Sequence, residues 1–198
     1  MSELRPDLAI ISDWIEPGSR VLDLGCGSGT LLKHLQDHKA VSGYGLEMQV
    51  KKVIACINAG VNVVHANLDD GLAQFGDNSF DYVILSQTLQ AVLRPDQLLR
   101  EILRCGREGI VTFPNFGHWA CRLQLAMGRM PVSKALPNYW YNTPNIHLCT
   151  VRDFEALCRT EQIVVQQRLR MDHHHRRRPG MGLLPNLMTD VALYRVSR

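Results

Sequence analysis

The amino-acid sequence predicts a single α/β domain, with a mostly parallel β-sheet and helices on both of its faces. Short apolar runs alternate along the chain with segments whose apolar residues recur at helical spacing, which is the pattern of strand–helix–strand units. The first apolar run ends in a cluster of glycines. A chain of 198 residues can bury one substantial core, and it contains no internal repeat or linker, so we expect residues 1–198 to form one domain.

The first half of the chain is predicted to alternate strictly between strands and helices. Five apolar runs are the expected parallel strands: Arg20–Leu24, Val41–Leu46, Val61–His65, Asp81–Leu85 and Gly109–Phe113. Three segments between them have helical periodicity: Thr30–His38, Gln49–Ala59 and Pro95–Arg104. Gly60 is a suitable C-terminal stop for the second helix, whose apolar residues fall on one face: Val50, Val53, Ile54 and Ile57.

The regular alternation ends at Pro114, and residues 116–149 are rich in proline and in polar and aromatic residues. We expect this segment to be a lid or a substrate-binding or partner-binding segment. Thr150 suits the N-cap of a helix that ends near Thr160, since Asp153 stands three residues further on. Two closing strands are predicted at Ile163–Arg170 and Val191–Val196, joined by a long loop at 171–189.

Composition and charge exclude several classes of protein. The 22 Lys and Arg against 19 Asp and Glu give a net charge of +3, which is too weak to indicate a nucleic-acid partner. The six cysteines form no CxxC pair, so no zinc or other metal site is expected. The N-terminus lacks a signal-peptide pattern, and no apolar run is long enough to cross a membrane. We therefore expect a cytoplasmic protein with reduced cysteines.

The glycine-rich sequence DLGCGSG at residues 23–29 is the strongest functional signal. Gly25, Gly27 and Gly29 let the backbone turn sharply and approach a ligand closely, and free N–H groups at the following helix favour an anionic group. Dinucleotide-binding loops need G-x-G-x-x-G or A, whereas Thr30 occupies the last position here. Asp23 would repel a pyrophosphate but attract an ammonium. The loop therefore favours a zwitterionic head group over NAD.

Polar residues also end the next strands, in an order that matches one nucleoside. Glu47 ends the second strand, where its carboxylate can accept hydrogen bonds from both ribose hydroxyls. Asn67 and Leu68 follow the third strand, where a side-chain oxygen and a backbone N–H can recognise adenine. Ser86 and Gln87 end the fourth strand and would face the sulfonium. Together these residues predict a site for S-adenosylmethionine or S-adenosylhomocysteine.

At these residues the chain resembles the Rossmann-like class I methyltransferases, and more narrowly the methionine biosynthesis protein MetW family. The second resemblance rests on SQTLQAV at 86–92, FPNFGHW at 113–119 and WYNTPNIHLCTVRDF at 140–154. It implies a seven-stranded sheet with a reversed last strand, and a role in methionine biosynthesis alongside homoserine O-acyltransferase. It implies no settled methyl acceptor. Asn67 departs from the family pattern, in which we expect Asp.

A catalytic group is harder to predict. Residues 116–149 contain the best candidates for a base or an acceptor-orienting group, His147 and Tyr141. We favour a structural role for both, because large aromatic side chains mainly bury area and a perturbed pKa cannot be read from sequence. Cys26 lies in the glycine loop, where we expect a packing role.

The basic run His173–Arg178 is predicted to be a solvated loop or, together with the Met- and Leu-rich segment Gly180–Met188, a docking surface. Its partner would be the acyltransferase or a second copy of this chain in a homodimer. Two functions therefore remain open: a nucleotide-binding accessory or regulatory subunit of homoserine acylation, and a methyltransferase acting on a small molecule or a protein.

Overall fold

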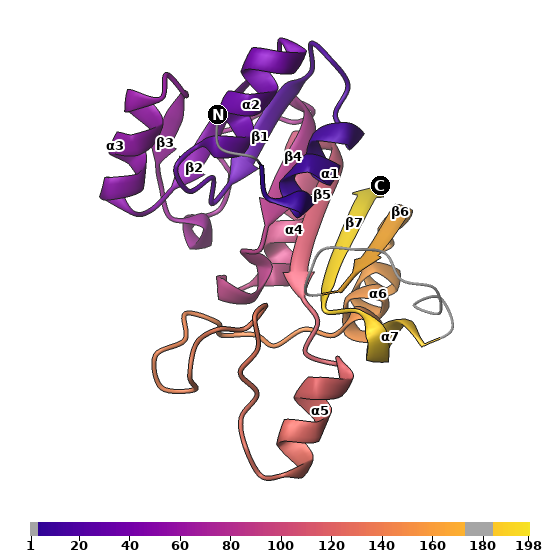
Figure 1. The fold of residues 1–198 in the computed structure, drawn as a ribbon. Coiled ribbons are helices and arrows are strands. Elements are labelled where there is room, and N and C mark those ends of the chain that lie inside the picture. Colours follow the sequence, from indigo (N-terminus) through magenta and orange to yellow (C-terminus); the bar gives the residue numbers. More distant parts are fainter. Residues whose placement is uncertain (1–3, 173–183) are drawn as a thin grey trace.

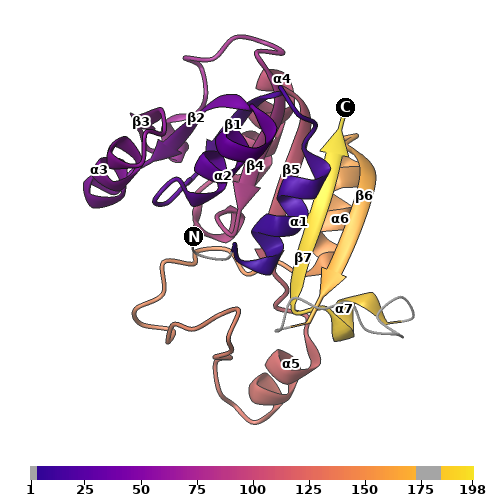
Figure 2. The same cartoon turned by 45° about the horizontal axis from the view of Figure 1, so that its top comes forward.

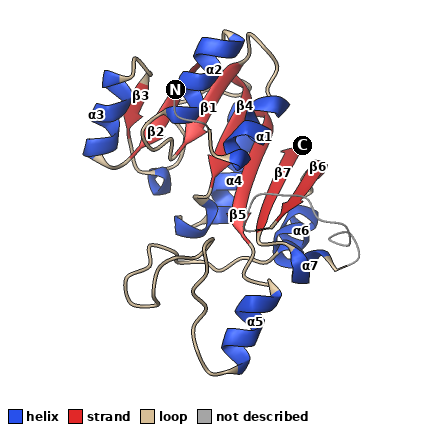
Figure 3. Cartoon of the chain, in the orientation of Figure 1, coloured by secondary structure: helices blue, strands red, loops and turns tan. Residues whose placement is uncertain are grey.

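The computed structural model describes residues 4–172 and 184–198, and these build one seven-stranded sheet with the order β3-β2-β1-β4-β5-β7-β6. Neighbouring strands from β3 to β5 are parallel, and β7 runs antiparallel to both β5 and β6 (Figures 1 and 3). The strands are β1 (Arg20–Leu24), β2 (Ser42–Glu47), β3 (Val63–His65), β4 (Phe80–Ser86), β5 (Gly106–Pro114), β6 (Val164–Met171) and β7 (Val191–Ser197). The predicted fold class, with its reversed last strand, is confirmed.

Helices cover both faces of this sheet. They are α1 (Pro6–Trp14), α2 (Thr30–Lys39), α3 (Val50–Asn58), α4 (Pro95–Cys105), α5 (Trp119–Ala126), α6 (Val151–Thr160) and α7 (Pro185–Met188), with short 3-10 turns at η1 (Leu68–Asp70) and η2 (Leu89–Ala91). Apolar residues of α1 and α2 pack in the core on one face, whereas those of α4 and α6 pack on the other (Figure 2). Helices α1, α5 and α7 were not predicted from the sequence.

Local sequence signals account for several helix boundaries. Thr150 caps α6 as predicted, because its hydroxyl oxygen accepts the Asp153 backbone N–H at 3.2 Å. Pro95 starts α4, where its missing N–H leaves no helical bond unmade. Gly29 and Ala40, which flank α2, both have left-handed backbones. Predicted and observed ends therefore agree within a few residues for the elements whose periodicity is strong.

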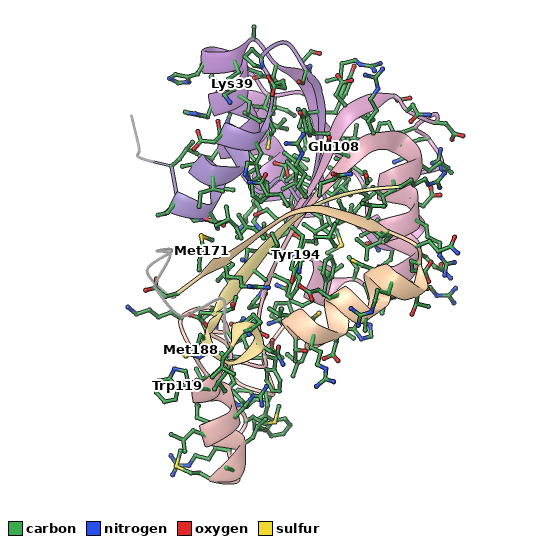
Figure 4. The ribbon with its side chains drawn as sticks, turned by 90° about the vertical axis from the view of Figure 1, so that its right-hand side faces the viewer. Lys39, Glu108, Trp119, Met171, Met188 and Tyr194 are labelled. Atoms are coloured by element: carbon green, nitrogen blue, oxygen red, sulfur yellow. The ribbon has the colours of Figure 1, made fainter. Side chains whose placement is uncertain are left out.

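An aromatic cluster joins the reversed end of the sheet to α6. Phe113 of β5, Phe154 of α6 and Tyr194 of β7 are fully buried, with ring centroids 4.6–5.9 Å apart. The Tyr194 hydroxyl donates to Glu155 at 3.0 Å. Figure 4 shows Tyr194 near the middle of the molecule and Trp119, in α5, at one end of it. The antiparallel strands are thus anchored in the core, while α5 extends beyond the carboxyl end of β5 (Figure 1).

The apolar face predicted for the second helix points toward solvent. Val50, Ile54 and Ile57 of α3 are each more than half exposed, and Cys56 is the buried residue of this helix. The reason lies in the sheet, since α3 packs beside β3, which is a three-residue edge strand and offers little surface to cover. Helical periodicity identified the face correctly, but it could not show whether anything lies against that face.

We predict that Gly43→Ala in β2 destabilises the protein. A Cβ at this position would lie 2.1 Å from the Val21 carbonyl oxygen of β1, and this contact is to backbone that cannot rotate away. Overpacking of this kind costs about 1–3 kcal/mol or more of unfolding free energy. Gly76→Ala is the matched control, because its nearest neighbour is the flexible Ser79 hydroxyl at 3.3 Å. Equal midpoints of urea unfolding for the two variants would contradict the prediction.

Candidate nucleotide-binding site

A cavity of about 410 Å³, called here the first cavity, opens at the carboxyl ends of the first four strands. The sheet order reverses direction between β1 and β4, which is the place where open parallel sheets bind ligands. Five of the residues predicted from sequence line this cavity: Gly25, Glu47, Asn67, Leu68 and Gln87. Residues at the carboxyl ends of four separate strands are therefore brought together at one edge of the sheet.

The glycine loop after β1 requires its glycines for conformation and for space. Gly25, Gly27 and Gly29 have φ angles of +71°, +61° and +77° in the left-handed region. A Cβ on Gly25 would lie 2.8 Å from the Thr88 hydroxyl, and one on Gly29 would lie 3.1 Å from Cys56 Sγ. The loop is thus held between the turn after β4 on one side and α3 on the other.

Glu47 holds the glycine loop in addition to lining the cavity. Its buried carboxylate accepts the Gly27 backbone N–H at 3.0 Å and the Gln49 backbone N–H at 2.8 Å. From the sequence, this carboxylate is expected to accept hydrogen bonds from ribose hydroxyls. A carboxylate has about four acceptor positions, so two hydrogen bonds to the backbone leave room for further donors.

Asn67 organises the turn that follows β3. Its side-chain oxygen accepts the Asp69 backbone N–H at 3.1 Å and begins the 3-10 turn η1. The Asp69 carboxylate in turn accepts the Leu93 backbone N–H at 2.8 Å. Asp69 also lines the first cavity, although it was not among the site residues predicted from the sequence. Its acidic side chain two residues after Asn67 was the signal that could have indicated it.

Asp23, at the end of β1, is a buried carboxyl in a poorly solvated place. Its pKa is raised to about 7, mainly because burial disfavours the ionised form and also because of the negative charge of Glu47, while the positive charge of Arg5 acts in the opposite direction. A cation brought to this carboxyl would stabilise its ionised form and lower the pKa. The site can therefore respond electrostatically to an ammonium group.

Ser86 is the last residue of β4 and Gln87 follows it, and both contact Thr112 of the neighbouring strand β5. The Ser86 hydroxyl lies 3.4 Å from the Thr112 hydroxyl of β5. Gln87 has a left-handed backbone with φ +54°, and its N–H donates to the Thr112 hydroxyl at 2.9 Å. A non-glycine residue in this conformation is uncommon and is often found at functional sites.

Gln87 also borders a second cavity of about 410 Å³, on the side of α1 and β7. The two cavities share Gln87 and Pro144 in their walls. The wall of the second cavity includes charged and amide side chains: Arg5, Asp7, Gln90, Lys134, Asn138, Asn145 and Asp190. This site could not be predicted from the sequence, because its residues come from five separate parts of the chain.

The structure places the two catalytic candidates elsewhere. His147 Nε2 lies 3.1 Å from the Leu93 carbonyl oxygen, and its backbone N–H donates to the Gln90 carbonyl. Tyr141 is exposed, with its ring stacked on that of Tyr139. The described residues that line the two cavities include neither of them.

Cys26 lies in the glycine loop with its sulfur 3.8 Å from that of Cys56. Burial is the main reason why the pKa of its thiol is raised, so the thiol stays neutral, as expected for a packing residue.

Among the residues that the structure describes, no group of three or more potential ligands could hold a metal ion. No helix in the same residues is both long and apolar enough to span a membrane. The predicted docking run at 173–178 lies outside the described residues.

Several solved structures that share this fold are methyltransferases. One, from Mesorhizobium loti, has a TM-score of 0.69 and 19% sequence identity, covering 98% of this chain and 96% of its own. Another, from Haemonchus contortus, is a phospholethanolamine N-methyltransferase 2 solved with phosphomonomethylethanolamine and S-adenosylhomocysteine. It has a TM-score of 0.72 and 14% identity, covering 97% of this chain and 52% of its own. Identities this low show a shared fold.

Sequence comparison is more specific. A Rhodopirellula baltica protein named "Bifunctional methionine biosynthesis protein MetXA/MetW" is 36% identical over 200 residues, which cover 96% of this chain. The chain spans about a third of that relative, since the match covers 32% of its length. The sequence profile described as "Methionine biosynthesis protein MetW" matches residues 5–196. The chain therefore belongs to the MetW family of methionine biosynthesis proteins.

Proposed function

We propose that this protein binds S-adenosylmethionine or S-adenosylhomocysteine and acts as an accessory or regulatory subunit of homoserine O-acyltransferase. The observation that carries the nucleotide part is the convergence of the glycine loop, Glu47 and Asn67 on one cavity at the switch point of the sheet. The cavity volume of about 410 Å³ falls in the range of small-molecule sites, roughly 300–1,000 Å³.

The residues present fit the three parts of such a nucleoside. The N–H groups at the start of α2, directly after the glycine loop, would hold the carboxylate of the amino-acid end, and the Asp23 carboxyl would hold its ammonium. Glu47 would accept from the ribose hydroxyls, and Asn67 with the Leu68 N–H would bind adenine. Ser86 and Gln87 would then lie near the sulfonium, which supplies a transferable methyl group when the nucleotide is bound. The desolvated carboxyl of Asp23 supports this orientation, because it gains most from a cationic partner.

The partner is inferred from the relative in which MetXA and MetW form one polypeptide. Joining two proteins in one chain keeps them at high effective concentration, which favours their association. We also propose that residues 1–198 act as one domain, in which residues 116–149 form the partner-binding segment. This segment contains no Asp or Glu, and its exposed aromatic residues include Trp119, Tyr139, Trp140 and Tyr141. Exposed Trp and Tyr side chains are typical of the energetic centres of protein interfaces.

Methyl transfer is the second candidate function, and the second cavity favours it. An acceptor bound there would meet the nucleotide at Gln87, which borders both cavities. Transfer of a labelled methyl group from S-adenosylmethionine to any fraction of a cell extract would support an enzyme. Label that stays in the nucleotide would support the accessory role.

We predict that the affinity for S-adenosylhomocysteine falls as the pH decreases below about 7. The ammonium of the ligand pairs with ionised Asp23, whose carboxyl takes up a proton in the free protein around that pH. The dissociation constant should rise by up to about tenfold for each unit of pH below this value. Calorimetric titrations at several values between about pH 5.5 and about pH 8.5 measure this change in affinity, because that range extends to both sides of a pKa of about 7.

Asp23→Asn is the matched variant, because it keeps the shape of the side chain. It should bind the ligand weakly and without this pH dependence. Folding raises the pKa of Asp23 from 3.8 to about 7, so the neutral carboxyl stabilises the folded protein fully below pH 3.8. That stabilisation is lost as the pH rises from 3.8 to about 7, and above this the buried charge remains unfavourable. Asp23→Asn should therefore raise the unfolding free energy at pH 8, on the order of 2–4 kcal/mol. Weak binding together with reduced stability would instead indicate a damaged fold.

The partner-binding segment is tested by Trp140→Ser. Trp140 is 72% exposed, so its removal should leave the fold intact while weakening co-purification with homoserine O-acyltransferase by tenfold or more. Ile57→Ser on α3 is the control, since it removes an apolar residue that is also mostly exposed, at 62%, from a different surface. If both variants retained the partner equally well, residues 116–149 would not be its docking site.

The regulatory role predicts reciprocal coupling between the partner and the nucleotide. If S-adenosylhomocysteine alters the affinity for the acyltransferase by some factor, the acyltransferase must alter the affinity for S-adenosylhomocysteine by the same factor. We expect a factor of about 5–150, the usual range for allosteric coupling. Calorimetric titrations with and without the partner measure it, and identical nucleotide affinities would rule out the regulatory role.

A further inference from the structure

We infer that the second cavity binds a small amino acid in its zwitterionic form, beside the nucleotide. The inference depends on the proposed function only in placing the nucleotide in the first cavity. Three observations carry it: charged groups of both signs in the wall, a buried hydrogen-bond acceptor without a donor, and a wall shared with the first cavity.

The charged groups of the second cavity suit a ligand with one positive and one negative end. Asp7 and Asp190 are carboxylates with only 1% and 4% exposure, and they favour a cationic group nearby. Arg5 donates to Asp7 through two hydrogen bonds of 2.9 and 3.1 Å. Lys134 stands on the loop after α5, and its ammonium forms no ion pair with another described residue. The two carboxylates would repel a purely anionic ligand, whereas a zwitterion would bring its carboxylate to Lys134 and its ammonium to the acidic side of the cavity.

Gln90 supplies the acceptor that this ligand would satisfy. Its side chain is only 7% exposed, and its Nε2 donates to the Gln87 carbonyl at 2.8 Å. Its backbone oxygen accepts the N–H groups of Ile146 and His147. Its side-chain Oε1 has no hydrogen-bond donor among the described residues, which is a costly state for a buried polar atom. An ammonium or hydroxyl of a bound ligand would provide the missing donor.

The shared wall connects this ligand to the nucleotide. Gln87 borders both cavities, its backbone is pinned to Thr112, and its carbonyl accepts from Gln90. Pro144 closes the same boundary from the loop that Gln90 holds through Ile146 and His147. A ligand that orders Gln90 thus acts on the same residues as the nucleotide, so we expect each ligand to change the affinity for the other.

The test uses L-homoserine as the probe, with two matched molecules that each lack one charge. 3-Amino-1-propanol lacks the carboxylate, and 4-hydroxybutanoate lacks the ammonium. Titrated into the full chain saturated with S-adenosylhomocysteine, L-homoserine should bind at least tenfold more tightly than either. Lys134→Ala should weaken this binding about tenfold and Lys134→Arg should restore it. Arg129→Ala, which removes an exposed charge outside the cavity wall, should have no effect.

The outcomes separate this inference from the proposed function. If S-adenosylhomocysteine binds but neither L-homoserine nor L-methionine does at millimolar concentration, the second cavity is not an amino-acid site and the inference is overturned. If the amino acid and S-adenosylhomocysteine exclude each other, the cavity belongs to the head group of the nucleotide, which also overturns it. If the amino acid binds, Lys134→Ala weakens it, and S-adenosylhomocysteine does not bind, the second cavity is an amino-acid site, while the proposed nucleotide function and the coupling between the two ligands fail.

Discussion

The contact between the glycine loop and β2 is the constraint on which the rest of the site depends. The N–H groups of Gly25 and Cys26 both donate to the Leu46 carbonyl, and Gly27 donates to the Glu47 carboxylate. This contact leaves no room for a Cβ at Gly45, which would lie 2.3 Å from Cys26 Sγ. Because the loop is tied to the second strand, the helix start, the acidic strand end and the turn after β4 meet at one edge of the sheet.

The same arrangement keeps a buried carboxyl where it is costly for stability. Asp23 lies near Glu47, so its ionisation is opposed both by desolvation and by a like charge. A protein selected for stability alone would have no reason to keep an acid at this position. Its presence makes sense if a cationic group of a ligand compensates for that cost, which is a common trade between stability and function. The raised pKa of Asp23 and the proposed position of the ligand ammonium thus have the same cause, which is the unfavourable ionisation of this buried carboxyl.

The two cavities meet at a short stretch after β4, where Gln87 borders both of them. A change at this residue in one cavity would therefore alter the wall of the other. Gln87 adopts a left-handed backbone that Thr112 holds in place, and Gln90 reaches back to it from the following turn. Gln90 also anchors the loop that returns from the exposed aromatic segment. Residues in ligand sites and in a proposed partner surface are therefore linked by hydrogen bonds. Such ordered contacts would let a ligand in either cavity act on a partner bound at that segment.

The sequence alone determined the alternation of strands and helices, the glycine loop, the strand-end residues Glu47, Asn67 and Gln87, and the cap at Thr150. These features depend on local periodicity, turn chemistry and the rule that parallel strands end at one edge, all of which act over short stretches of chain. Only the tertiary structure decided that the apolar face of α3 is exposed, that His147 and Tyr141 lie away from the cavities, and that Arg5, Gln90, Lys134 and Asp190 surround a second one. Those outcomes depend on which distant segments pack together, and no local pattern records the neighbours of a side chain.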